Sequence, residues 1–178
     1  MPEKVGLVPA AGEGQAVGRA RASQEVEASA TTALEHLGKM FTNEKVLNWE
    51  IQFDKEATIQ GYSGLPAQCD CAYCRNFHMT LQRIPLEFAT LLQKFGIDPA
   101  QPAEIVHYND NPDGTHYYGW WYHLVGQIMS GTESLVDFAQ GMQIEFRNKD
   151  ELAPKNFPRP IIQVEFFANL PWVLDEKP

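Results

Sequence analysis

The chain has 178 residues, of which 44% are hydrophobic and 21% are charged, the composition of an ordinary soluble globular protein. Its 23 acidic side chains outnumber the 14 basic ones and leave a formal net charge of −9. This charge argues against a nucleic-acid-binding protein and a membrane-surface protein, because both classes set clustered cations against phosphates.

The amino-terminal part differs in composition from the rest. Residues 1–40 contain none of the 20 aromatic side chains. We expect residues 1–22 to form a flexible tail, because they have too few apolar side chains to bury. Apolar side chains then recur at helical spacing from Val26 to Phe41 and predict a helical arm over residues 23–45. The arm either packs on the domain or binds a partner.

Residues 46–178 are predicted to fold as a single domain with about five to six antiparallel strands. Residues 49–53 and 58–62 flank a polar break, and this pattern predicts a β-hairpin. Alternating or aromatic-rich segments predict the other strands, over residues 103–109, 115–129, 142–147 and 162–166.

Two helices are predicted between this hairpin and the later strands. The first covers about residues 71–81, and the second begins at Pro85 and ends before Gly96. The second has one apolar face, which predicts that it covers a sheet. The expected fold class is therefore α+β: an antiparallel sheet with two helices packed on one face, plus the N-terminal helical arm.

The strongest chemical signal is the spacing C-x-C-x2-C-x3-H formed by Cys69, Cys71, Cys74 and His78. On a helix that begins near Cys71, the last three residues share one face. Cys69 can fold back over the amino end of the helix, where free N–H groups favour thiolates. Three thiolates and an imidazole suit zinc, so the sequence predicts a closed structural zinc site with these four ligands.

Other interpretations of the same residues remain open. The cysteines are also suitable small core residues, and His107 or His123 is an alternative fourth ligand. Cys74 and His78, one helical turn apart, match a nucleophile–base pair of a thiol enzyme. Water in place of His78 would instead give a catalytic zinc site.

Residues 116–123 carry aromatic side chains on both faces of one predicted strand. Tyr118, Trp120 and Tyr122 share one of these faces. They either lie in a core that is covered on both sides or form an open ligand or partner surface.

The histidines of this region are predicted not to form a metal centre. If the preceding loop closes around Pro112, His107 and His116 point to opposite faces of the sheet. Asp110 and Asp113 are then expected to form the turn and not to bind a cation.

Four short segments carry a resemblance to a known family: GYSGLP at 61–66, CAYCRNF at 71–77, FGIDP at 95–99 and LPWVL at 170–174. The chain resembles an uncharacterised family of small bacterial proteins that share a C-x-C-x2-C-R-N-F segment and a C-terminal L-P-W-V-L run. The resemblance covers about residues 46–175. It implies a single bacterial or phage-borne domain and brings no activity with it.

The interpretation that best fits these signals is a non-enzymatic binding or accessory protein with a structural zinc ion. Its partner would be a protein or a small-molecule ligand, and neither a nucleic acid nor a membrane. Three cysteines within six residues and the lack of a signal-peptide core predict a cytoplasmic location. The alternatives are a thiol- or zinc-dependent enzyme that acts on a small substrate, and an acidic protein-interaction factor encoded by a phage.

Overall fold

The computed structural model describes residues 41–63, 65, 68–132 and 134–177. The tail predicted over residues 1–22 lies outside these ranges, as does the arm up to residue 40. The last residues assigned to the arm are not helical, because Thr42–Val46 form the first strand, β1. The arm therefore cannot extend to residue 45.

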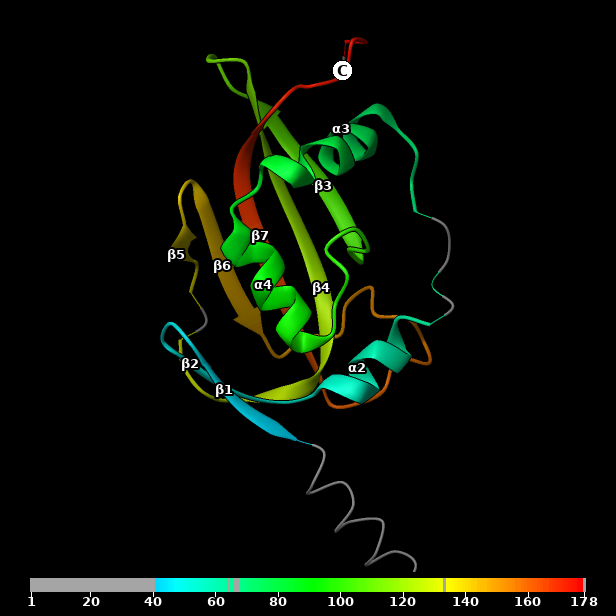
Figure 1. The fold of residues 1–178 in the computed structure, drawn as a ribbon, viewed down its shortest axis with the longest axis vertical. Helices are drawn as coiled ribbons and strands as arrows, with labels where there is room; N and C mark the ends of the chain where they lie inside the picture. The colour runs from blue at the N-terminus through cyan, green and yellow to red at the C-terminus, as the bar shows by residue number, and fades with distance from the viewer. Residues whose placement is uncertain (1–40, 64, 66–67, 133, 178) are drawn as a thin grey trace, which may run out of the picture. The chain divides into compact units, whose positions relative to one another are not determined.

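The described residues form a seven-stranded antiparallel sheet with three α-helices, which confirms an α+β fold (Figure 1). The strand order is β1-β2-β4-β7-β6-β5, and β3 also pairs with β4. The strands are β1 (Thr42–Val46), β2 (Trp49–Asp54), β3 (Glu104–Asp110), β4 (Thr115–Ser130), β5 (Val136–Ala139), β6 (Met142–Arg147) and β7 (Ile161–Pro171). The sheet is larger than predicted because β1 and β5 have no clear alternation in the sequence.

The 16-residue strand β4 organises the sheet and confirms the predicted long aromatic strand. Its first half pairs with β3 and its last residues pair with β2, so both strands share one edge of β4. Strand β7 pairs along the other edge. Gly126 permits the close approach of β2, because a Cβ atom there would lie 2.4 Å from the Gln52 carbonyl oxygen.

The hairpin predicted from residues 49–53 and 58–62 is wrong, because Lys55–Gly61 form the helix α2. Asp54 begins this helix: its Oδ1 atom accepts a hydrogen bond from the Ala57 N–H at 2.9 Å. The Thr58 hydroxyl donates to the Asp54 carbonyl oxygen at 2.7 Å and accepts from a backbone N–H of β4 at 2.9 Å. Strand β2 forms its hairpin with β1 instead.

Both predicted helices after α2 are confirmed as α3 (Ala72–Thr80) and α4 (Leu86–Phe95), joined by a 3₁₀ turn at Leu81–Arg83. Figure 1 shows that α3 and α4 lie across the same face of the sheet. Gly96 ends α4 in the left-handed conformation, with φ 81°. Within the described ranges, no helix combines the length and the apolar character that a membrane span requires.

The aromatic side chains proposed as a ligand or partner surface lie in the core instead. Tyr118, Trp120 and Tyr122 are each 0% exposed, because α3 and α4 cover them. The ring of Phe77 from α3 and that of Phe88 from α4 contact Trp120, with centroids 5.1 Å and 5.9 Å away. This face of β4 is therefore not available to a partner.

Candidate metal centres

The three cysteines meet at the amino end of α3. The Sγ atoms of Cys69, Cys71 and Cys74 all lie within 4.8 Å of one another. Cys74 is buried, whereas Cys69 and Cys71 are exposed, and all three thiols are free. This arrangement can hold a metal ion that prefers sulfur ligands.

The start of α3 explains why the sulfurs converge. Cys71 is the residue that caps the helix, and Cys74 is the third residue of its first turn. The backbone N–H of Cys74 lowers the pKa of Cys71, as do the neighbouring thiols. Burial raises the pKa of Cys74. Of Cys71 and Cys74, Cys71 is thus the thiol that ionises first, at the positive end of the helix dipole.

Two residues that follow Cys74 fasten this turn to the end of the chain. Arg75 donates hydrogen bonds to the Asp70 carbonyl oxygen and to the Glu176 carboxylate. Asn76 is 0% exposed and accepts a hydrogen bond from the Val173 N–H at 2.8 Å. The turn that carries the cysteines is therefore held by contacts to the residue before Cys71 and to the C-terminal segment.

His78 is not part of this sulfur group, although the sequence predicts it as the fourth ligand. It lies one turn beyond Cys74 on α3, half-buried, with its ring edge-on to the ring of Phe77 at 5.4 Å. Burial lowers the pKa of His78, so the imidazole is neutral at physiological pH. A ligand role for His78 stays a prediction.

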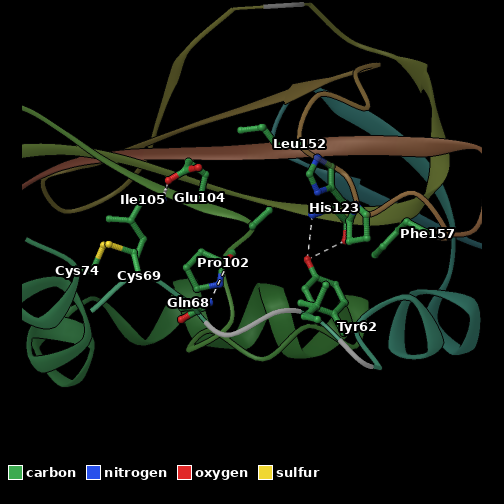
Figure 2. A pocket seen from close by; sticks show the side chains of 13 residues that line it. Tyr62, Gln68, Cys69, Cys74, Pro102, Glu104, Ile105, His123, Leu152 and Phe157 are labelled. Atoms are coloured by element: carbon green, nitrogen blue, oxygen red, sulfur yellow. Dashed lines mark hydrogen bonds between the residues drawn. The ribbon is translucent and has the colours of Figure 1, made fainter. Parts of the chain in front are cut away.

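A pocket of about 320 Å³ opens beside the sulfur group, and Cys69 and Cys74 line it. Figure 2 shows these two side chains at one end of the pocket and Tyr62, His123 and Phe157 at the other. The volume is that of a site for a small ligand. A metal on the cysteines would therefore border a cavity and not a packed core.

Hydrogen bonds hold the walls of the pocket in place. The Tyr62 hydroxyl donates to the His123 carbonyl oxygen at 3.0 Å and accepts from the His123 N–H at 2.9 Å. Gln68, which precedes the cysteines, donates to the Pro102 carbonyl oxygen at 2.9 Å. The Gln68 contact ties the segment before α3 to the residues before β3, and the Tyr62 contacts tie the end of α2 to β4. The pocket is therefore largely preformed.

A second group of possible metal ligands lies on the β3–β4 hairpin, and it corrects the prediction that its histidines diverge. Asn109 pairs with Tyr117 and His107 pairs with Tyr118, so the bulge at Tyr108 adds one residue to β3. Because the extra residue changes the register, His107 and His116 lie on the same face. Their ring nitrogens and one oxygen of Asp110 all lie within 4.8 Å of one another.

The two aspartates of this turn differ in their roles. Asp113 accepts hydrogen bonds from the Thr115 N–H at 2.9 Å and from the Thr115 hydroxyl at 2.7 Å, which confirms a turn-forming role. Asp110 instead lies against the two histidine rings. The sequence gives no clear sign of the bulge, so spacing alone could not identify this group.

Comparisons with family models, with curated proteins and with solved structures find no match to this chain. The resemblance to the small bacterial family therefore stays a prediction. We therefore base the proposed function on the geometry of the sulfur group and of the pocket beside it.

Proposed function

We propose that this protein is a zinc-dependent binding protein in which Cys69, Cys71 and Cys74 hold one zinc ion at the end of a small-ligand pocket. The observation that carries the proposal is the convergence of three free sulfurs beside that pocket. Three thiols this close are otherwise an oxidation liability, and a bound metal protects them.

The sulfur positions suit a tetrahedral ion with little movement. Sulfur atoms about 2.3 Å from a tetrahedral zinc ion are roughly 3.8 Å apart. No pair of these sulfurs exceeds that separation by more than about an ångström, because all three lie within 4.8 Å of one another. Cys69 and Cys71 are exposed and can close this gap by side-chain rotation.

The ion would have a structural and a binding role. It would join the segment that carries Cys69 to the amino end of α3, as a cross-link joins two parts of a chain. With three protein ligands, its fourth position is open to water or to a donor atom of a ligand in the pocket. Such a site needs reduced thiols, which agrees with the predicted cytoplasmic location.

The test is a titration of the untagged, reduced protein with Cd²⁺, a sulfur-preferring substitute for zinc, followed by sulfur-to-cadmium charge-transfer absorption in the ultraviolet. We expect one equivalent to bind, and we expect Cys69→Ser, Cys71→Ser and Cys74→Ser each to remove most of the signal. His78→Ala is the matched control, since it changes the predicted fourth ligand on the same helix. We expect His78→Ala to bind as the wild type does.

Two results would count against this assignment. Wild-type protein that gives no charge-transfer band, with three thiols that still titrate, would show that the sulfurs do not bind metal. Loss of binding in His78→Ala would instead indicate the closed four-ligand site.

A zinc enzyme is the second candidate, because three protein ligands and a water are typical of catalytic zinc. Glu104 lines the same pocket and is a possible general base. Hydrolysis of an activated ester by the zinc-loaded protein, lost in Glu104→Gln while zinc is retained, would favour the enzyme. If the ester is hydrolysed equally slowly with and without zinc, the result would favour the binding protein.

A further inference from the structure

The group on the β3–β4 hairpin has close contacts that the sulfur site does not explain. His116 Nδ1 and His107 Nε2 lie 2.8 Å and 3.1 Å from the same oxygen, Asp110 Oδ1. The two ring nitrogens are 3.2 Å apart. The three atoms thus form a nearly equilateral triangle.

This triangle has the dimensions of one face of a metal coordination sphere. Donor atoms about 2.1 Å from an ion and at right angles to one another are about 3.0 Å apart. The three measured separations, 2.8, 3.1 and 3.2 Å, lie on both sides of that value. Two imidazoles and one carboxylate on a common face are also a known donor set for divalent transition metals. We propose that His107, Asp110 and His116 form a second metal site, for a divalent first-row transition metal ion.

The two rings are held in position by aromatic neighbours. The His107 ring stacks on Tyr73 of α3, with centroids 4.1 Å apart and planes 13° apart. The His116 ring lies against Trp172, with centroids 5.0 Å apart. Both imidazoles therefore keep their orientation without an ion, which lowers the cost of binding one.

One side of the proposed site is open to solvent. The side chains of His107 and His116 are 13% and 8% exposed, whereas that of Asp110 is 65% exposed. An ion on this triangle would have protein on one side and solvent on the other. Water or an exchangeable ligand would complete its coordination. The site goes beyond the proposed function, because none of the three cysteines contributes to it.

The donor set also limits the kind of ion. Imidazole nitrogen binds zinc, iron, cobalt and nickel well, whereas magnesium and calcium prefer all-oxygen sites. The alternative without a metal is that Asp110 accepts a hydrogen bond from each ring. A metal site and a hydrogen-bonded cluster differ in one measurable property, the uptake of an ion.

The test adds Co²⁺ to wild-type protein whose cysteines are already filled with Cd²⁺. We expect one further equivalent with the weak visible absorption of six-coordinate cobalt and without sulfur-to-cobalt charge transfer. Asp110→Asn should lower the cobalt affinity at least roughly tenfold, because loss of an outer-shell partner alone costs about 10- to 100-fold. Asp113→Asn, in the same turn, is the control and should bind cobalt as the wild type does.

A second measurement follows the imidazole nitrogens of His107 and His116 by NMR while Zn²⁺ is added to the cadmium-filled protein. We expect the His107 Nε2 and His116 Nδ1 signals to shift together and to saturate at one equivalent. The absence of a second equivalent, or a cobalt affinity unchanged in Asp110→Asn, would overturn the site and leave a hydrogen-bonded cluster. Asp110→Asn and Asp113→Asn both leave the three cysteines unchanged, so a difference in cobalt affinity between these two variants is independent of the sulfur site.

Discussion

Replacing Asn76 with alanine should lower the free energy of unfolding by about 3–5 kcal/mol, the largest loss expected from a polar side chain in the described fold. Asn76 accepts from the Val173 N–H at 2.8 Å and donates to the Pro171 carbonyl oxygen at 3.1 Å and to the Tyr118 hydroxyl at 3.4 Å. Alanine leaves these groups without their partner in a buried site. The loss should exceed the small gain that alanine brings to a helix.

Urea denaturation followed by tryptophan fluorescence measures this loss. Asn169→Ala is the matched control, because Asn169 is exposed and its side chain accepts a hydrogen bond from the Asn111 side chain at 2.9 Å. We expect the control to change stability by less than about 1 kcal/mol. Equal, small losses in both variants would show that Asn76 does not hold the C-terminal segment on α3.

Removing zinc should cause the second large effect. An ion that binds the folded chain alone, at a free concentration 1,000 times its dissociation constant, adds about 4 kcal/mol to stability. A chelator should therefore lower the melting temperature of the zinc-loaded wild type by several degrees or more. Differential scanning calorimetry before and after chelation measures this difference.

Two variants assign that effect to the sulfur site. Cys71→Ser changes an exposed residue and should make the melting temperature nearly insensitive to the chelator. Asp110→Asn leaves all three sulfurs in place and should keep most of the wild-type difference. If Cys71→Ser responds to the chelator as strongly as the wild type, the stabilising ion is held elsewhere.

The sequence predicted the elements in which one periodicity is strong. The alternation along β6 and the apolar face of α4 each specified an element and the side that it buries. The glycine that ends α4 was also correctly identified from the sequence. These signals are local, so the elements that they predict depend little on how distant segments of the chain pack.

Helix α2 shows where local propensity failed. Thr58 and Ile59 favour a strand, and the residues before them looked like a polar turn. In the structure Asp54 caps a helix instead, and Thr58 is buried against β4. The sequence does contain the capping signal, an aspartate followed by good helix formers, but the same residues also match a polar break between two strands.

The histidine group was missed because it depends on one extra residue in β3. A simple hairpin register places His107 and His116 on opposite faces, and a β-bulge reverses this. Tyr108 occupies the bulge, is 50% exposed and lies near the ring of Phe167, with centroids 6.2 Å apart. Phe167 belongs to β7, which is distant in the sequence, so the surroundings of the bulged residue cannot be predicted from the pattern of β3 alone.

The aromatic strand shows a similar limit. Its alternation correctly placed Tyr118, Trp120 and Tyr122 on one face, but it could not say which face the helices cover. That depends on how α3 and α4 cross the sheet, which the sequence of β4 alone does not specify.

The most direct test of the central claim is zinc X-ray absorption spectroscopy on the Asp110→Asn variant loaded with one equivalent of zinc. The proposed site predicts three sulfur neighbours at about 2.3 Å and one lighter neighbour at about 2.0–2.2 Å. A first shell made only of nitrogen and oxygen would contradict it, because the ion would then lie away from Cys69, Cys71 and Cys74.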